Sequence, residues 1–508
     1  MRKYTAWCLG LLLAVGPLTA AEPQGKLVYE AWDAAYLEGA KVGASHTTVR
    51  EVERDGQKLL RAGVELNLAL KRYNATAHLR MQTGSDETPD GKVLAVVMKQ
   101  FLSQDQQLTL TGVVEGDQLH VRTQDGRLDK KVPWDDRVIG LYRAERVFQD
   151  HKVEPGDHFT YLSYEPTVTS VVTVRVTVKE PEEVEVLGVK KRLLRVEAVP
   201  DKVRGPQGPI PLPSMTVWLD KDRMAVRNQT ELPGVGTLVF YRTTRAVAQA
   251  EGAPATVGRG SDIGLKSMVR LNRIIERPQE TRSVVYRVTL QGDDDPASAF
   301  AQDDRQTARD VHGKTFDLHV RALRRPRPVE EAAPAKEEFL KSCTYLDSDD
   351  ARVRNYARQA VGPERDPWKK AQRIERWVYL HVRHDNTVPF TTAGKVAEDL
   401  RGDCRQKAML AAAMCRAAGV PSRTAVGLIY AEVPEGSPVM AFHMWAEVYV
   451  AGQWLAIDGT LGQGSVGADH VKIADSSWYN TESQTPLLPV ARVLGKVAIR
   501  VVRVNDEE

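Results

Sequence analysis

Residues 402–418 hold a cysteine in a setting that suits nucleophilic chemistry. Gly402-Asp-Cys404 precedes a helix-like run over residues 405–418, which Gly419 and Pro421 bring to an end. Cys404 is therefore expected on the first turn of a helix, where unpaired backbone N–H groups and the helix dipole favour a thiolate. The same N–H groups could donate to an oxyanion formed beside the sulfur. A merely buried structural cysteine is the alternative reading of this motif.

A second segment offers partners for that thiol. Residues 441–450 alternate in the period of a strand, and Ala451-Gly452 separates them from a second strand-like run, Gln453-Trp-Leu-Ala-Ile-Asp458. If Ala451-Gly452 form a tight hairpin turn, Val450 pairs with Gln453, and Asp458 lies diagonal to His443 on the same sheet face. A register shifted by one residue would place Asp458 on the opposite face.

These two segments predict a triad with three distinct roles. Cys404 would be the nucleophile, His443 the general base, and Asp458 the group that orients His443. Core packing is the expected role of Trp377, Trp445 and Trp454, and an ion pair is the expected role of Glu447. The histidines His381, His384 and His470 show no carboxylate or metal partner in the sequence and are expected at the surface. No metal site is predicted.

Four motifs in this order resemble the transglutaminase-like superfamily, and the resemblance extends over roughly residues 335 to 480. The motifs are Gly402-Asp-Cys404, Arg416-Ala-Ala-Gly-Val-Pro-Ser-Arg423, His443-Met-Trp-Ala-Glu-Val-Tyr449 and Trp454-Leu-Ala-Ile-Asp-Gly-Thr460. Tyr345-Leu-Asp-Ser-Asp-Asp350 and Asp469-His-Val-Lys472 resemble bacterial secreted members. The resemblance implies a papain-like α+β core, with the cysteine on a helix and the histidine and aspartate on a sheet. It also implies that no calcium or other cofactor is needed.

The chain departs from the family pattern at two places. Arg405-Gln-Lys407 follows the cysteine, where family members often carry acidic or histidine residues, and Asp458-Gly-Thr460 replaces the frequent Asp-Pro-Thr. Neither departure touches the triad. Both concern the surroundings in which a substrate would bind.

The N-terminus carries the signature of a secretory signal peptide over residues 1–21. Arg2 and Lys3 precede the apolar run Leu9-Gly-Leu-Leu-Leu-Ala-Val15, and small residues follow up to Ala21. The apolar run is too short to span a bilayer as a stable helix, so no stable membrane insertion is expected. The mature protein is therefore expected to be secreted or periplasmic.

The rest of the chain divides into a β-rich front and an α+β rear. Residues 22–245 alternate as strands, for example over Val172–Val178, and contain hairpin patterns of a mainly antiparallel β domain. Residues 246–264 are small and polar, as in a linker, and residues 265–330 predict a small β-rich region. From residue 331 to 508 helical patterns begin and then give way to strands, as expected of the transglutaminase-type domain.

Charge and cysteine content narrow the classes of partner and scaffold. The 508 residues include 70 Lys+Arg and 67 Asp+Glu, and no basic block stands out, so no nucleic-acid partner is expected. Four cysteines without CxxC pairs argue against a disulfide scaffold or a structural zinc module. Cys8 lies in the signal peptide, Cys415 is expected in the core, and a bond between Cys343 and Cys415 stays open.

The sequence thus predicts an extracytoplasmic cysteine-dependent acyl-transfer enzyme that hydrolyses peptide or other amide bonds of a peptide or protein substrate. Two alternatives remain at this level. The first is a non-catalytic envelope protein that binds a lipid or protein through the β domain, with the transglutaminase-like fold as scaffold. The second is a protein cross-linking transglutaminase. The oligomeric state cannot be read from the sequence.

Overall fold

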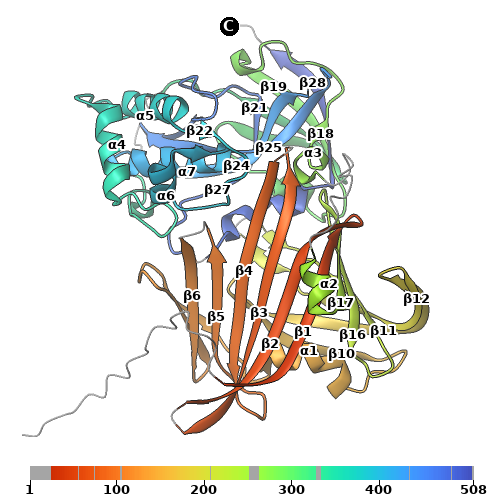
Figure 1. The fold of residues 1–508 in the computed structure, drawn as a ribbon. Coiled ribbons are helices and arrows are strands. Elements are labelled where there is room, and N and C mark those ends of the chain that lie inside the picture. Colours follow the sequence, from red (N-terminus) through yellow and green to blue (C-terminus); the bar gives the residue numbers. More distant parts are fainter. Residues whose placement is uncertain are drawn as a thin grey trace, which may run out of the picture.

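The computed structural model describes residues 25–505, apart from positions 55, 74, 103–105, 206–207, 251–261, 328–332, 434 and 482. The predicted signal peptide, residues 1–21, and most of the predicted linker, residues 246–264, lie outside the described residues. The chain forms a large N-terminal antiparallel sheet followed by an α+β region, as the sequence predicts (Figure 1). Among the described residues, no helix has the length and apolar character needed to cross a membrane.

Fifteen strands form the N-terminal sheet, and nearly all of them pair with their neighbours in the chain. Their order is β8-β7-β6-β5-β4-β3-β2-β1-β17-β16-β15-β12-β11-β10-β9. They are β1 (Lys26–Leu37), β2 (Ala40–Arg54), β3 (Gln57–Arg72), β4 (Ala75–Glu87), β5 (Val93–Phe101), β6 (Gln107–Glu115), β7 (Gln118–Thr123), β8 (Asp129–Pro133), β9 (Val138–Ile139), β10 (His158–Glu165), β11 (Ser170–Val186), β12 (Val189–Pro200), β15 (Met215–Leu219), β16 (Ala225–Leu232) and β17 (Gly236–Thr243). The remaining pair, β13 (Val203–Gly205) and β14 (Gly208–Ile210), forms a separate ribbon.

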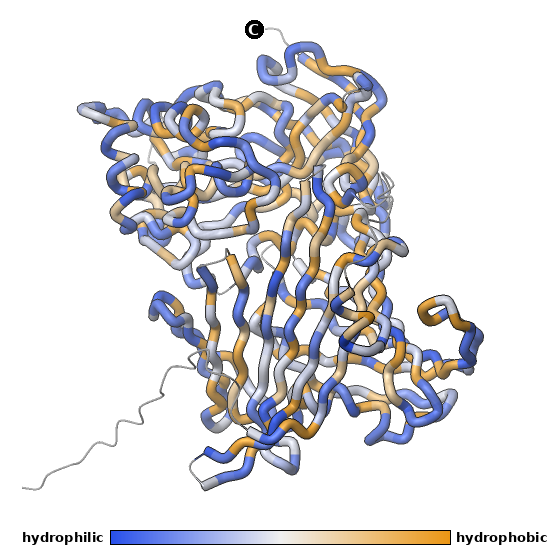
Figure 2. The backbone as a smooth tube through the Cα atoms, in the orientation of Figure 1, coloured by the Kyte–Doolittle hydropathy of each residue, from blue (hydrophilic) through white to orange (hydrophobic). Residues whose placement is uncertain are grey.

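Alternating side chains make this sheet, and its two ends share a core. In β11 the valines at 172, 174, 176 and 178 are buried while Arg175 is exposed, which confirms the predicted strand. Hydrophilic and hydrophobic residues alternate along many strands of the sheet (Figure 2). Side chains of β5–β8 pack against Leu162 and Val171 near the other end, so the sheet curls around a shared interior. A helix that the alternation did not predict, α1 (Leu141–Asp150), inserts Val147 and Phe148 against β11, β12 and β15.

The second half places helices against a five-stranded antiparallel sheet. The sheet has the order β18-β25-β24-β27, with β26 paired to β25. Its strands are β18 (Val269–Arg270), β24 (Ser422–Glu432), β25 (Pro438–Val450), β26 (Gln453–Ile457) and β27 (His470–Ser476). The helices are α4 (Ala351–Val361), α5 (Pro367–His381), α6 (Ala393–Asp399) and α7 (Cys404–Ala417), with the short elements α3 (Ile263–Lys266), α8 (Val490–Val493), β22 (Arg383–His384) and β23 (Arg401–Gly402). The short helix α2 (Arg245–Gln249) instead packs against β1 and β2 of the N-terminal sheet.

The core of this half explains why α7 is so apolar. Residues 408–415 of α7 are at most 2% exposed, and they pack with Met444, Ala446 and Val448 of β25. A helix buried on nearly every side requires small and apolar residues all round, and its alanines meet that need. The sheet is therefore fixed directly against the helix that begins at Cys404.

A four-stranded sheet covers the other face of the central sheet. Its order is β20-β21-β19-β28, from β20 (Gln306–His312), β21 (Thr315–Arg321), β19 (Ser283–Leu290) and β28 (Val497–Asn505). Since β28 pairs with β19 along its length, this sheet joins chain segments on both sides of the predicted boundary at residue 330. The alternation in the sequence predicted β19 and β21 but not the return of the C-terminal strand, which depends on a long-range pairing.

The N-terminal sheet and the second half are packed together. Leu102 and Leu108, next to and within the β5–β6 hairpin, belong to the same core cluster as α7. Arg127 forms an ion pair with Asp349, in which one guanidinium nitrogen lies 2.9 and 3.1 Å from the two carboxylate oxygens. The upper ends of β3 and β4 also reach the second half (Figure 1).

Candidate active site

Cys404 is the first residue of α7, and a capping box formed by Asp403 and Gln406 fixes the start of this helix. Asp403 accepts a hydrogen bond from the Arg405 N–H at 2.9 Å, and the Gln406 side chain returns to the Asp403 N–H at 3.1 Å. This capping box satisfies two of the free groups at the helix start. Cys404 is a free thiol of intermediate exposure, in the place the sequence predicts.

The hairpin register brings His443 and Asp458 together as predicted. Val450 pairs with Gln453, and the turn residues Ala451 and Gly452 have φ angles of 51° and 83°. These left-handed values belong to the tight turn type that matches strand twist. The His443 Nε2–H donates to the Asp458 carboxylate at 2.7 Å, and both side chains are buried.

His443 also faces Cys404. Burial works against a charged imidazole. The charges of Asp458 and of the Cys404 sulfur, together with the hydrogen bond that His443 donates to Asp458, outweigh burial and raise the pKa of His443 well above its usual value. Because Nε2 is engaged by Asp458, the ring's other nitrogen, Nδ1, is the one available to the sulfur. The arrangement therefore favours an imidazolium beside a thiolate.

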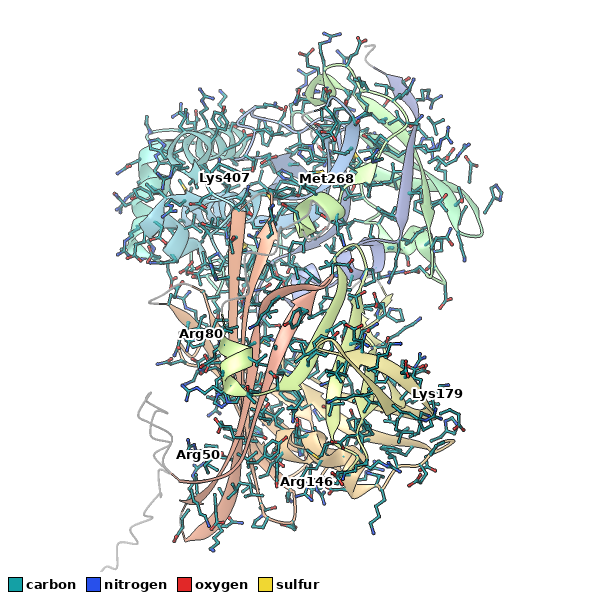
Figure 3. All side chains as sticks on the ribbon, turned by 45° about the vertical axis from the view of Figure 1, so that its right-hand side comes forward. Arg50, Arg80, Arg146, Lys179, Met268 and Lys407 are labelled. Atoms are coloured by element: carbon teal, nitrogen blue, oxygen red, sulfur yellow. The ribbon has the colours of Figure 1, made fainter. Side chains whose placement is uncertain are left out.

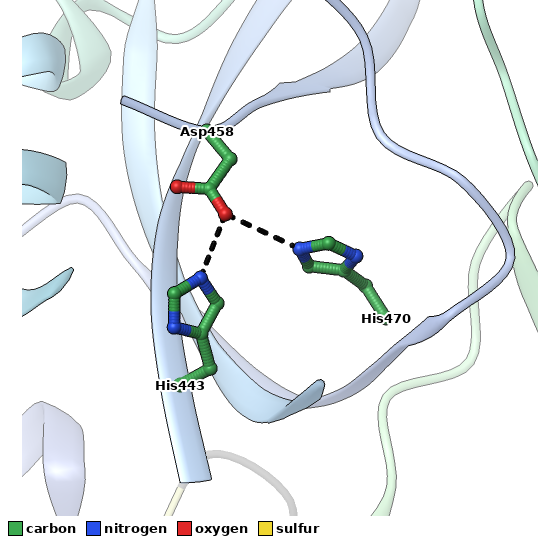
Figure 4. Close-up of side chains that lie close together, drawn as sticks. All are labelled: His443, Asp458 and His470. Atoms are coloured by element: carbon green, nitrogen blue, oxygen red, sulfur yellow. Dashed lines mark hydrogen bonds and ion pairs between the residues drawn. The ribbon is translucent and has the colours of Figure 1, made fainter. Parts of the chain in front are cut away.

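A second histidine completes the group, and here the sequence prediction was wrong. His470 was expected at the surface; instead it is 1% exposed at the start of β27. Its Nε2 lies 3.4 Å from the same Asp458 oxygen (Figure 4). Its Nδ1 lies 2.8 Å from Asp469. Burial opposes protonation, but the two carboxylates raise the pKa of His470, and an imidazolium can donate to both.

The signal for His470 was present in the sequence. Val471 and Ile473 alternate with His470 and Lys472 in a short strand pattern, and the adjacent Asp469 supplied the missing carboxylate. What could not be seen was the pairing of β27 with β24, which turns His470 toward Asp458. By contrast, His381 and His384 are exposed, as expected.

The ligand atoms of His443, Asp458 and His470 lie within 4.8 Å of one another, so this set could also hold a metal ion. In the structure each histidine instead contacts the shared Asp458 oxygen directly. Hydrogen bonding accounts for the cluster: the Asp458 carboxylate accepts from His443 and His470 on one oxygen and from the Thr460 backbone N–H, at 2.7 Å, on the other. Burial opposes its charge, but His443 and His470 together hold the pKa of Asp458 far below its usual range.

Glu375 supports Asp458 from behind. It lies on α5, is 1% exposed, and its Oε1 accepts the Asp458 backbone N–H at 3.2 Å. Burial, with some contribution from the Asp458 charge, raises the pKa of Glu375 to about 7. Glu375 was not predicted as part of the site, because an acidic residue on a helix is usually exposed to solvent.

The predicted surroundings of the triad are otherwise found. Trp445 is completely buried and Trp377 is 9% exposed, consistent with core packing, while Trp454 is half-buried against Arg423. Glu447 is 1% exposed and pairs with Arg423 and Lys472, as the ion-pair interpretation expects.

The two remaining described cysteines are both free and buried. Cys415 is fully buried in the core around α7, as predicted. Burial raises the pKa of both the Cys343 and Cys415 thiols, so both stay protonated and unreactive. The bond between them that the sequence left open is not formed, and Cys404 is the accessible thiol among the described residues.

The N-terminal sheet also contributes to this site, which the sequence did not reveal. Arg72, the last residue of β3, makes an ion pair with Asp403, the residue that caps α7. The charge of Cys404 acts on both Arg72 and the adjacent Tyr73. Because Arg72 is separated from Asp403 by more than 300 residues, no local pattern could have linked them.

Replacing His470 with leucine tests whether it positions Asp458. Asp458 would lose one of its three donors, so the pKa of Asp458 rises and His443 is held less firmly. We expect the rate of Cys404 alkylation at low pH to fall about tenfold, and its acid limb to begin at higher pH. His470→Gln, which keeps one N–H donor, should retain most of the rate. Equal pH profiles for wild type and His470→Leu would contradict the assignment.

Comparison with known proteins places this site in a recognised family. The family model of the transglutaminase-like superfamily matches residues 354–459, a span that includes Cys404, His443 and Asp458. An uncharacterized protein of Haemophilus influenzae is 30% identical over 97 residues, which cover 18% of this chain and 26% of that protein. The matched part is thus about a quarter of the relative's length.

Two solved structures are also similar to parts of the chain. A putative cysteine protease from Cytophaga hutchinsonii is 16% identical, with a TM-score of 0.29, over 44% of this chain and 86% of that one. A beta-barrel-like protein with a domain of unknown function from Brucella abortus is 12% identical, with a TM-score of 0.33, over 43% of this chain and 97% of that one. The part of the chain that matches the transglutaminase-like superfamily thus contains Cys404, His443 and Asp458.

Proposed function

We propose that this protein is an extracytoplasmic cysteine hydrolase that cleaves peptide or other amide bonds through Cys404, His443 and Asp458. The observation that carries the proposal is the position of His443: its Nε2 is 2.7 Å from Asp458, and the charge of Cys404, at the start of α7, acts on its ring. This arrangement suits a nucleophile, a base and a group that orients the base. The signal-peptide pattern of residues 1–21 supports export from the cytoplasm.

Acyl transfer at this site would proceed in two halves. The Cys404 thiolate attacks the amide carbonyl carbon, and the backbone N–H groups at the start of α7 stabilise the oxyanion. The His443 imidazolium gives its proton to the departing amine, which leaves a thioester on Cys404. His443 then takes a proton from water, whose oxygen attacks the thioester, and the acid is released with the thiolate restored.

Hydrolysis and transamidation differ only in the second acceptor, so one assay can separate them. We would incubate the protein with a peptide mixture in ¹⁸O-water containing a biotinylated primary amine, and identify the products by mass spectrometry. Hydrolysis predicts new carboxyl termini that carry ¹⁸O and that are absent with Cys404→Ala. Biotin-labelled peptides as the main product would instead favour a cross-linking enzyme.

A third result would favour the binding alternative. If neither product forms while Cys404 reacts only as an ordinary thiol, the transglutaminase-like domain serves as a scaffold and the proposal fails. His384→Ala is a matched control, since His384 is exposed and lies in β22, which pairs with the segment just before Cys404. It should form products at the wild-type rate.

A further inference from the structure

The β3–β4 hairpin of the N-terminal sheet ends beside the proposed nucleophile. At its tip, Arg72 pairs with Asp403, and the Tyr73 backbone N–H donates to the Asp262 carboxylate at 2.9 Å. Tyr73 has a φ of +50°, an uncommon value for a bulky residue, and its ring lies so close to Gly264 that a Cβ there would be 2.8 Å from it. These contacts fix Arg72 and Tyr73 against the second half.

Two guanidinium groups share one carboxylate at this tip, since Asp403 accepts from both Arg72 and Arg405. Burial lowers the pKa of Arg72, but Asp403 and the Cys404 sulfur outweigh it and raise the pKa. Arg72 therefore holds a positive charge next to Cys404.

Lys407 adds a second positive charge on the same side of α7. It follows Cys404 by three residues and so lies on the same helix face, and helical side chains lean toward the N-terminus, here toward Cys404. It is 5% exposed, yet its Nζ makes no hydrogen bond or ion pair with any residue that the structure describes. The Lys407 Nζ lies 5.9 Å from the centroid of the Tyr379 ring.

Most of the Lys407 side chain is buried, as the long apolar stem of a lysine can be while its ammonium stays available to a ligand. Burial lowers the pKa of Lys407, and the charges of Asp458 and Cys404 act in the other direction. Asp458 is already engaged by two histidines. Figure 3 shows Lys407 above the ends of the hairpin strands that carry Arg72 to this site.

We propose that Arg72 and Lys407 form a carboxylate-binding subsite beside Cys404, so that the enzyme selects acyl donors with a carboxylate close to the scissile amide. This inference rests on the proposed function and names its substrate class. A bound carboxylate would accept a hydrogen bond from the Lys407 ammonium, which donates to no residue that the structure describes, and would lie beside the Arg72 charge. The N-terminal sheet would then contribute directly to substrate choice.

Two alkylating reagents of nearly equal shape test the subsite. Iodoacetate and iodoacetamide both lose iodide to the Cys404 thiolate, but only iodoacetate carries a carboxylate. We expect the ratio of their rate constants, iodoacetate over iodoacetamide, to fall about five- to tenfold in Lys407→Gln and in Arg72→Gln. Lys407→Arg and Arg72→Lys, which keep the charge, should restore most of the ratio.

Controls separate this proposal from folding effects and from the proposed function. Lys71→Gln removes a charge from the neighbouring position of the same strand, whose side chain points to the other sheet face, and should leave the ratio unchanged. A fast iodoacetamide reaction at pH 5–6 with a ratio that neither variant changes would overturn the subsite and leave the enzyme proposal standing. A slow iodoacetamide reaction at that pH would overturn the enzyme proposal itself.

The carboxylate could belong to a chain terminus or to an acidic side chain. Protection of Cys404 from iodoacetamide distinguishes them, with tetra-alanine as free acid or amide, and with an amidated Ala-Glu-Ala peptide or its Gln counterpart. Protection by the free acid alone assigns a C-terminal carboxylate, and protection by the Glu peptide alone assigns an acidic side chain. Equal protection by acid and amide forms in both pairs would contradict the subsite.

Discussion

Replacing His443 with alanine is expected to lower Cys404-dependent amide hydrolysis by about 10²–10⁴-fold, the usual contribution of a positioned acid–base group. His443 has two tasks in the proposed reaction: it keeps Cys404 as a thiolate and it protonates the departing amine. Its contact with Asp458 at 2.7 Å fixes the ring for both tasks. The rate of ¹⁸O incorporation into peptide products measures the effect.

Two further variants test whether His443 and Asp458 act together. Asp458→Asn should also lose most activity, because the amide no longer compensates the imidazolium charge. The double variant His443→Ala/Asp458→Asn should be only slightly slower than His443→Ala, since the two residues act as one unit. Fully additive losses, or a His443→Ala rate within a few-fold of wild type, would be inconsistent with a coupled triad.

Replacing Glu447 with glutamine is expected to destabilise the protein by about 3–5 kcal/mol, a large part of a typical folding free energy. Glu447 is 1% exposed and lies between Arg423, at 2.7 Å, and Lys472, at 3.1 Å. Lys472 also pairs with Asp475 and Asp303. Without the Glu447 charge, two buried cations would share the two less buried carboxylates.

The effect should depend on pH in a defined direction. Burial raises the pKa of Glu447, but Lys472 and Arg423 outweigh it and lower the pKa to about 2, from an ordinary value of 4.5. The carboxylate thus contributes stability above pH 4.5 and loses it as the pH falls toward 2. Denaturant unfolding of wild type and Glu447→Gln should converge across this range.

The exposed Glu435, in the turn between β24 and β25, offers a control for this stability prediction. Glu435→Gln should change the unfolding free energy by less than about 0.5 kcal/mol. A Glu447→Gln protein as stable as wild type at pH 7 would mean that the buried ion cluster contributes specificity rather than stability.

Local patterns predicted the triad because each part of it depends on short-range rules. The Asp403 cap and Gly419 fix the two ends of α7, and the two-residue turn at Ala451-Gly452 fixes the register that places Asp458 beside His443. Alternation likewise located β11 and β19. Each of these features is decided within about fifteen residues of sequence.

The features that escaped prediction depend on contacts between distant segments. His470 reaches Asp458 only because β27 pairs with β24, and β28 joins β19 across more than 200 residues. Arg72 meets Asp403 because two halves of the chain pack together. An isolated sequence contains no register rule for such pairs, so it reveals neither the burial of His470 nor the ion pair of Arg72 with Asp403.

The pH dependence of Cys404 alkylation by iodoacetamide tests the central claim most directly, with Cys404→Ala as the blank. The thiolate–imidazolium pair predicts a rate at pH 5–6 that is close to the rate at pH 8, and its loss at low pH in His443→Ala. A wild-type rate that rises only near pH ~8.5, as for an ordinary thiol, and that His443→Ala leaves unchanged, would contradict the account.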